Sequence, residues 1–285
     1  MSLPKLDNFD SYIHQVHQAI FLFGAIAHQV IPKQQNWLHI ATEPYPWGFQ
    51  TQVFPTGGRL IFNVSAGNIQ LQHGDGNTDI FALVDHTQKS LFEAILSAMD
   101  GHELVNYFDA DSDLSHSEQL LSKIHSDDQK LTDAVAEHTH ETSLAYDVNS
   151  ANDYLHALNT IYTGIARWRG RLNGHLSPMV VWAEHFDLST IWFATPEMDE
   201  YKSHINIGFA PFTEGVFERP YLYAYAYPYQ EDYKTPNLDA PLKWETEAYT
   251  GIYVSYDNLT DYDDPVSAIE MLCGQIFKTM RTVLG

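Results

Sequence analysis

The spacing of the hydrophobic residues changes along the chain, and this change constrains the fold more than any other feature of the sequence. From residue 9 to residue 31, apolar side chains recur every three or four positions, which predicts a helix that ends before Pro32. Apolar and polar residues then alternate in short segments separated by turn signals such as Gly57-Gly58. Turns this short join neighbouring antiparallel strands. The strands expected in this half are 37–41, 47–54, 60–64, 69–72 and 79–83.

A similar order of elements returns in the second half of the chain. After a helix from about residue 87 to Gly101, the sequence predicts a long helix over 150–172, and Asp264 followed by Pro265 predicts the start of a last helix. The strands expected between these two are 179–183, 186–193, 205–209, 221–227 and 249–256. Residues 1–100 and 150–285 therefore both read as helix, five strands, helix. An internal duplication is a hypothesis, and it requires the same strand order in both sheets.

This order of elements predicts the α+β class, with antiparallel sheets flanked by helices. Helices on one face of each sheet leave the other face for solvent, a partner or a ligand. Between the two halves, residues 101–149 hold eleven acidic residues against two lysines, a net charge of −9, together with five histidines. Ser115 and Glu118 have the spacing of a helix-capping pair. We therefore expect an acidic helical connector in this segment.

The chain is strongly acidic. Its 15 Lys and Arg residues against 37 Asp and Glu residues give a net charge of −22, which repels phosphate backbones and anionic lipids. We expect neither nucleic acid nor a membrane as a partner, because the longest apolar run, 19–27, is also too short to span a bilayer. Cys273 is the only cysteine, which excludes an internal disulfide bond and fits a cytoplasmic protein.

The common cofactor and hydrolase motifs are missing from the sequence. It contains no glycine-rich phosphate loop, no Gly-x-Ser-x-Gly and no His-Glu-x-x-His. The sequence therefore leaves the cofactor unknown.

Residues 221–229 form the most unusual segment, because every second residue is a tyrosine. In a strand, alternate side chains share one face, so Tyr223, Tyr225 and Tyr227 would line one side of a sheet. A row of phenols offers stacking surfaces and hydroxyl groups to a small, partly apolar ligand. The alternative is an ordinary sheet face covered by a neighbouring segment, since tyrosine has a high strand propensity.

His185 and Asp187 share one strand face, and with His204 they match a two-histidine, one-carboxylate metal site. The alternative is that Asp187 accepts backbone hydrogen bonds at a turn and both histidines have local partners. We favour this second interpretation and assign no metal ligands.

Four short motifs occur in a fixed order: Ser177-Pro178, Phe186-Asp187-Leu188, Ser203-His204 and the Ala-Tyr-Ala-Tyr-Pro segment 224–228. With them the chain resembles a bacterial family recorded as a domain of unknown function, over most of its length outside residues 101–149. It departs from the family pattern at His185, Val180 and Trp192. The resemblance implies a cytoplasmic bacterial protein and no established activity, fold or cofactor. The matching positions are the site candidates, with Asp187 and His204 as a pair: Asp187, Ser203, His204, Tyr223, Tyr225 and Tyr227.

These observations favour a small-ligand-binding module that uses the tyrosine face, with Asp187 and His204 as polar anchors. An alternative is an enzyme in which Asp187 orients His204 as a general base, or in which these residues hold a metal. A third possibility is a structural or interaction protein that forms a homodimer through an exposed sheet or edge.

Overall fold

The structure, a computed structural model, describes residues 2–7, 9–104, 107–127, 141, 143–230 and 235–284. Contacts within the chain divide it into two compact units. The N-terminal unit comprises Asn8–Asn152 and Val181–Phe186, and the C-terminal unit comprises Met1–Asp7, Asp153–Val180 and Asp187–Gly285.

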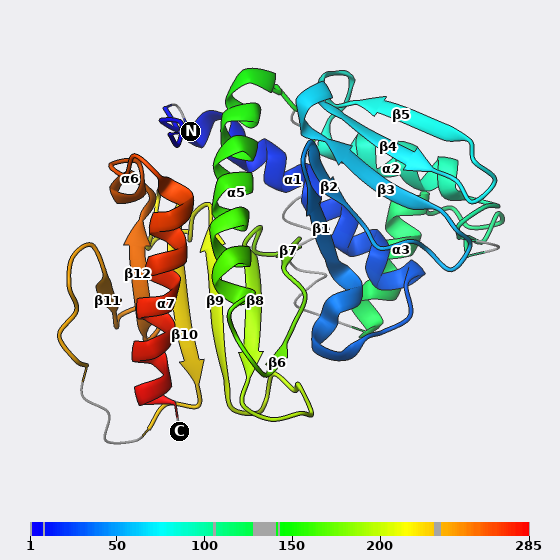
Figure 1. The fold of residues 1–285 in the computed structure, drawn as a ribbon. Coiled ribbons are helices and arrows are strands. Elements are labelled where there is room, and N and C mark those ends of the chain that lie inside the picture. The colour runs from blue at the N-terminus through cyan, green and yellow to red at the C-terminus, as the bar shows by residue number, and fades with distance from the viewer. Residues whose placement is uncertain are drawn as a thin grey trace. The chain divides into compact units, whose positions relative to one another are not determined.

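The N-terminal unit is an antiparallel sheet with helices on one side (Figure 1). Its strands β1 to β5 pair in chain order, and β7 pairs with β1 at the other end. The strands are β1 (Ala41–Tyr45), β2 (Gly48–Gln50), β3 (Arg59–Asn63), β4 (Asn68–Gln72), β5 (Thr78–Ala82) and β7 (Val180–Trp182). The helices are α1 (Asp10–Val30), α2 (Gln88–Met99) and α3 (His116–Asp127), with 3₁₀ turns η1 (Gln35–Ile40), η2 (Val64–Ala66) and η3 (Leu83–Asp85).

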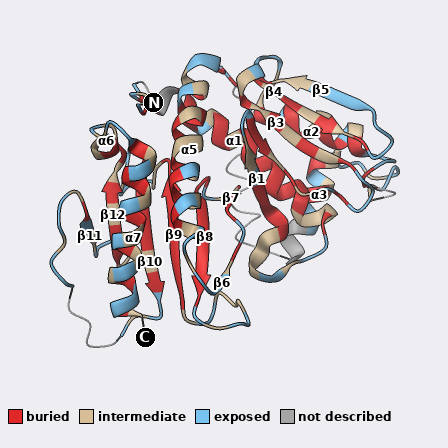
Figure 2. Cartoon of the chain, in the orientation of Figure 1, coloured by how far each residue is buried: buried red, intermediate tan, exposed pale blue. Residues whose placement is uncertain are grey.

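Burial alternates along the central strands of this sheet, as expected when only one face is packed. In β3 and β4, Leu60, Phe62, Ile69 and Leu71 are fully buried, whereas the residues between them are half-exposed (Figure 2). The buried side chains form one face, and this face therefore supplies the core beneath the helices.

The C-terminal unit is built on antiparallel strands in the order β11-β12-β10-β9-β8, with β6 paired to β8. Its strands are β6 (His175–Leu176), β8 (Leu188–Phe193), β9 (His204–Ala210), β10 (Tyr221–Tyr227), β11 (Lys243–Glu245) and β12 (Gly251–Ser255). Most of α5 (Val148–Arg169) belongs to this unit, together with α6 (Tyr256–Leu259) and α7 (Pro265–Val283). Helices α5 and α7 lie on one face of the sheet (Figure 1).

A glycine permits the close approach of α5 and α7. A Cβ atom at Gly164 would lie 2.6 Å from Cγ2 of Ile269, closer than side chains pack.

Helix α7 begins as the sequence predicts, because the Asp264 side chain accepts a hydrogen bond from the backbone amide of Ser267 at 3.2 Å and Pro265 follows it.

The predicted α+β class is confirmed, but the predicted equality of strand order is wrong. In the N-terminal unit β1 to β5 follow one another in space as in sequence. In the C-terminal unit β12 lies between β10 and β11. The β11–β12 hairpin therefore pairs with β10 through its second strand, so the order in space differs from the order in sequence. The duplication hypothesis therefore loses the property on which it depended.

The strand expected at 37–41 is also wrong. Residues Gln35–Ile40 form the 3₁₀ turn η1, and the strand begins only at Ala41. Asn36 and Trp37 adopt left-handed backbone angles, with φ of 54° and 57°, which no strand allows. The Trp37 ring then stacks on the ring of His39 at 5.8 Å, so an aromatic cluster replaces the strand pairing.

The capping pair predicted within residues 101–149 is present at the start of α3. The backbone amide of Ser115 donates to the Glu118 carboxylate at 2.8 Å, and the amide of Glu118 donates to Ser115 Oγ at 3.3 Å. The Glu93 carboxylate of α2 accepts two further amides of this first turn, at 3.0 and 2.9 Å. The predicted helical residues beyond position 127 and the histidines at 138 and 140 lie outside the described residues.

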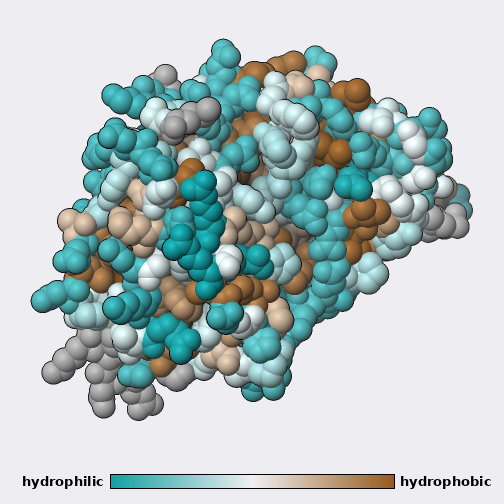
Figure 3. Space-filling view, in the orientation of Figure 1, coloured by the Kyte–Doolittle hydropathy of each residue, from teal (hydrophilic) through white to brown (hydrophobic). Residues whose placement is uncertain are grey.

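Hydrophilic side chains cover most of the surface seen in Figure 3, and the hydrophobic ones form separate small patches among them. Among the described helices, none has the length and apolar composition to cross a membrane.

Candidate functional site

The tyrosine strand β10 has the alternation that the sequence predicts. Tyr223 pairs with Gly208 of β9 and Tyr253 of β12, and Tyr225 pairs with Asn206 and Gly251. Paired residues share a sheet face, so these side chains lie together, opposite the face on which Leu222, Ala224 and Ala226 are buried. We call the tyrosine side the aromatic face. It consists of Tyr221, Tyr223, Tyr225, Tyr249, Tyr253 and Phe217.

The rings of the aromatic face pack against one another in a row. The centroids of Tyr223 and Tyr225 are 6.4 Å apart with the rings nearly parallel, and those of Tyr221 and Tyr223 are 5.9 Å apart. The ring of Phe217, from the segment between β9 and β10, packs against the ring of Tyr221, with the centroids 4.2 Å apart and the planes tilted by 30°. Tyr221 and Tyr223 are buried, whereas Tyr227 at the end of the strand is 45 % exposed. The chain itself therefore covers the Tyr221 end of the row with the segment that carries Phe217.

Two glycines make room for rings that lie flat on the sheet. A Cβ atom at Gly208 would lie 2.7 Å from the Tyr223 ring, and one at Gly251 would lie 2.6 Å from the Tyr249 ring. Glycine within a strand permits such an approach because it carries no side chain.

Asp187 and Tyr223 form the polar centre beneath this cover. The Tyr223 hydroxyl donates a short hydrogen bond to Oδ2 of Asp187, and both residues are more than nine-tenths buried. Burial, and then the neighbouring carboxylate of Asp187, raise the pKa of Tyr223 well above 10. The phenol therefore keeps its proton at neutral pH and remains a donor to Asp187.

The predicted pairing of Asp187 with His204 is wrong. In the β8–β9 hairpin Leu188 pairs with Phe209 and Phe193 pairs with His204, so Asp187 and His204 lie at opposite ends. Six residue positions along a strand correspond to about 20 Å. His204 Nδ1 instead lies 2.9 Å from the carbonyl oxygen of Lys202, and burial lowers the pKa of its imidazole. Asp187 cannot orient His204 as a general base.

The other site candidates near His204 have local roles. The His204 ring lies beside the rings of Tyr225 and Tyr227, with ring centroids 6.0 and 5.6 Å apart. The carbonyl of Ser203 accepts a hydrogen bond from the amide of Ala194 at 2.9 Å, which closes the β8–β9 hairpin.

The metal site considered for His185, Asp187 and His204 is wrong as well, because the described residues form no group of three or more histidine, cysteine or carboxylate ligands able to hold a metal.

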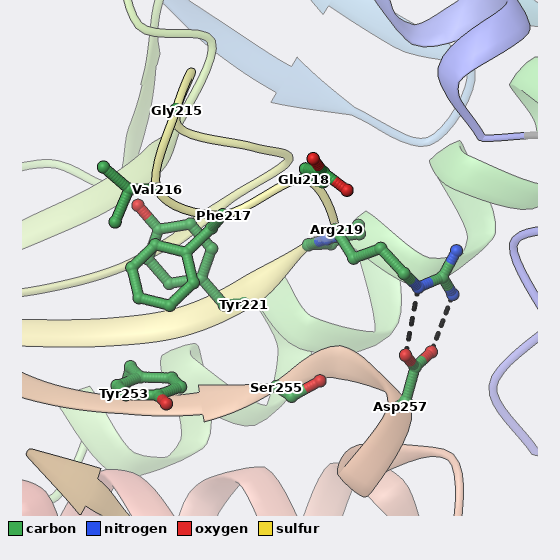
Figure 4. A pocket seen from close by; sticks show the side chains of 10 residues that line it. Gly215, Val216, Phe217, Glu218, Arg219, Tyr221, Tyr253, Ser255 and Asp257 are labelled. Carbon is green, nitrogen blue, oxygen red and sulfur yellow. Dashed lines mark hydrogen bonds and ion pairs between the residues drawn. The ribbon is translucent and has the colours of Figure 1, made fainter. Parts of the chain in front are cut away.

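A pocket of about 390 Å³ lies at the Tyr221 end of the aromatic face. Figure 4 shows the Phe217 and Tyr221 rings close together on one side, and Tyr253 with the Ser255 hydroxyl on the neighbouring strand. We call this cavity the Tyr221 pocket. Its remaining lining residues are Gly215, Val216, Glu218, Arg219, Pro220 and Asp257.

Hydrogen bonds fix two walls of the Tyr221 pocket. The Tyr221 hydroxyl lies 2.5 Å from Oγ1 of Thr213, which ties the loop to the strand. Arg219 donates to both carboxylate oxygens of Asp257, at 3.0 and 2.6 Å, and to the carbonyl of Leu6 at 3.0 Å. The arginine is therefore held away from the rings, as Figure 4 shows.

Four lining residues were not predicted from the sequence: Phe217, Arg219, Tyr253 and Asp257. Of these four residues, Tyr253 was the easiest to predict, because it alternates with buried residues in the predicted strand 249–256. Phe217 and Arg219 lie in a segment without periodicity, and only the fold brings Asp257 beside Arg219.

The fold and the pocket define an α+β protein of two units with antiparallel strands, and the C-terminal unit carries an aromatic face and an adjoining pocket. The chain belongs to a family of unknown function (DUF5996), whose model matches residues 2–282. This confirms the resemblance to a family without an assigned function. The comparison with curated proteins found no match, and the comparison with solved structures found none.

Proposed function

We propose that this protein is a small-ligand-binding module and that its ligand binds in the Tyr221 pocket. The observation that carries the proposal is the incomplete cover of the aromatic face. Phe217 closes the row over Tyr221, but between that ring, Tyr253 and Ser255 a volume of about 390 Å³ is left. Small-molecule sites typically have volumes of roughly 300–1,000 Å³ and combine aromatic walls with a few polar groups.

The polar anchors differ from those expected at first. The Asp187 carboxylate is engaged by Tyr223, and His204 lies at the far end of β9. In the Tyr221 pocket, the Ser255 hydroxyl and the Glu218 carboxylate line the cavity in their place. The aromatic rings would supply stacking area, and these two groups would fix the orientation of the ligand.

Saturation-transfer NMR with three small probes tests this proposal. The probes are 2-phenylethanol, phenylethylammonium and phenylacetate, which share one ring and differ in charge. We expect at least one to bind with a dissociation constant of about 1 mM, as suits ligands of this size. The variant Ser255→Trp fills the pocket and should abolish the signal.

The matched control is Gln70→Trp, which adds the same side chain to the half-exposed face of the other sheet and should leave the signal unchanged. The proposal is wrong if no probe binds, or if Ser255→Trp binds as well as the unchanged protein while both variants remain folded by circular dichroism.

A second candidate function is self-association, which we propose through strand β5. This strand ends the strand order of its sheet, and its residues Thr78, Asp79 and Ile80 are exposed, Ile80 to 63 %. An edge strand offers unpaired backbone groups to a second copy. Two copies of charge −22 repel each other, so the dimer should gain population as salt screens this repulsion.

Light scattering coupled to size-exclusion chromatography tests self-association. We expect the dimer fraction to rise between low and high salt, and Ile80→Lys to remove it. A monomer at every salt concentration would refute this second candidate without affecting the first.

A further inference from the structure

We propose that the Tyr221 pocket selects an organic cation, an ammonium group attached to a flat apolar body. This inference rests on the proposed function, because it names the ligand class for the same site. It is carried by the charges that line the pocket and by the hydrogen bonds in which they are already engaged.

The arginine of the pocket is already paired with a carboxylate. Each guanidinium nitrogen of Arg219 already donates, Nε and Nη2 to Asp257 at 3.0 and 2.6 Å and Nη1 to the Leu6 carbonyl at 3.0 Å. The bidentate arrangement is the strongest geometry for such a pair. An anionic ligand at Arg219 would lie beside the Asp257 carboxylate, which repels it.

The remaining charge of the lining is negative. Arg219 contributes one positive charge, and Asp257 and Glu218 contribute two negative charges, which leaves a net charge of −1. Glu218 is exposed and forms no part of the Arg219–Asp257 pair. Its carboxylate is therefore the charged group that a ligand meets at the rim.

The aromatic walls favour the same class of ligand. The ring centroid of Phe217 lies 4.2 Å from that of Tyr221 and 4.9 Å from that of Tyr253, so three rings meet at one side of the cavity. The faces of aromatic rings carry partial negative charge and attract ammonium groups. The flat body of the ligand would pack on the same rings.

The field of the whole chain acts in the same direction. A net charge of −22 raises the local concentration of cations and lowers that of anions, most strongly at low salt. Burial is the main cause that raises the pKa of Tyr221, and the carboxylates of Asp187 and Glu245 raise it further, so both add to this field close to the pocket. Local and global charge therefore select against anions together.

The three probes of the binding test also decide this inference. We expect phenylethylammonium to bind about tenfold more tightly than 2-phenylethanol, the order of a single cation–π contact combined with one carboxylate. Phenylacetate should show no measurable affinity. Raising the salt concentration should weaken phenylethylammonium and leave 2-phenylethanol unchanged.

Two variants locate the effect. Glu218→Gln should lower the ratio of the phenylethylammonium affinity to the 2-phenylethanol affinity about threefold, as expected for an exposed ion pair. Glu214→Gln is the matched control, because it removes the same charge from the same exposed loop at a residue outside the lining. It should leave both affinities unchanged.

The outcomes separate the two proposals. If 2-phenylethanol or phenylacetate binds at least as tightly as phenylethylammonium and Ser255→Trp abolishes that binding, the protein binds small ligands but the inference of a cation is wrong. If Glu214→Gln weakens the cation as much as Glu218→Gln, the selection arises from overall charge and the inference is wrong too. If no probe binds, the proposed function fails.

Discussion

The strands of the two units differ in how far the face opposite their helices is covered. In the N-terminal unit that face is open, and its residues in β3 and β4 are half-exposed and rich in amides, such as Asn63, Asn68, Gln70 and Gln72. In the C-terminal unit every residue of β8 and β9 is buried, so both faces of the sheet are covered. Amide side chains hydrogen-bond to water and need no cover, whereas a row of aromatic rings does.

This difference explains where a site can form. The aromatic face exposes a large apolar area unless the chain folds back over it, and the segment that carries Phe217 does so. Because this cover stops at Tyr221, a pocket is left beside it. An open amide face has no such boundary between covered and uncovered rings.

The largest effect is expected from Gly208→Val, which tests the close cover of the aromatic face. The new Cβ would lie 2.6 Å from the Leu188 carbonyl oxygen and 2.7 Å from the Tyr223 ring, and neither has room to move. We expect the free energy of unfolding in urea to fall by about 3 kcal/mol. A loss below 0.5 kcal/mol, roughly the effect of an ordinary surface change, would show that the rings do not lie flat on β9.

The next effect is expected from Tyr223→Phe, which leaves the buried carboxylate of Asp187 without this donor. Loss of a hydrogen bond to a charged group should lower the unfolding free energy by about 2 kcal/mol. Tyr227→Phe is the matched control, since that ring is 45 % exposed, and it should change the stability by less than about 0.5 kcal/mol. Equal losses in the two variants would contradict a closed aromatic face.

A smaller, pH-dependent effect is expected from His73 in the N-terminal unit. Its ring contacts Asp79 at 2.7 Å and Glu103 at 3.0 Å, and it lies near His102 and Asp75. Burial lowers the pKa of His73, but hydrogen bonds to Asp79 and Glu103 outweigh it and raise the pKa above 6.5. The open-faced unit thus places its buried charges at the end of a hairpin rather than under aromatic rings.

The sign follows from the raised pKa. The folded state binds the proton more tightly than the unfolded state, so the stabilisation is complete below pH 6.5 and is lost as the pH rises through the higher folded pKa. We expect His73→Gln to cost about 1 kcal/mol more at pH 6 than at pH 9 in urea unfolding. A cost that does not change with pH, or that grows toward pH 9, would contradict the ion pairs of His73 with Asp79 and Glu103.

The smallest effect is expected from Gln70→Val on the open face of the N-terminal sheet. This residue is half-exposed, and a β-branched side chain suits a strand, so the unfolding free energy should change by less than about 0.5 kcal/mol. A loss of several kcal/mol would mean that this face is covered in solution, and the contrast between the two sheets would then fail.

The local patterns of the sequence predicted most of the elements. A repeat of three to four residues identified α1, and the tyrosine alternation identified β10 with the rings on one face. Asp264-Pro265 marked the start of α7 because caps are local interactions between neighbouring residues. The turn at Trp37 escaped prediction, because the alternation of apolar and polar residues does not reveal the left-handed backbone of Asn36 and Trp37.

The candidate site was only half predictable. The pairing of Asp187 with His204 required a strand register, and seventeen residues of spacing do not determine one. The hairpin instead places these residues at opposite ends. Asp187 nevertheless contacts the aromatic face, because it accepts a hydrogen bond from Tyr223, thirty-six positions away in the sequence.

The sequence by itself determined the fold class, the acidic field of the chain and the side of the sheet on which the tyrosines lie, because composition and period-two alternation are properties of single segments. Only the tertiary structure decided which side chains meet. Strand register placed Gly208 under Tyr223, and the return of the segment that carries Phe217 left a pocket beside Tyr221. These contacts arise from the docking of distant segments, whose geometry no local pattern contains.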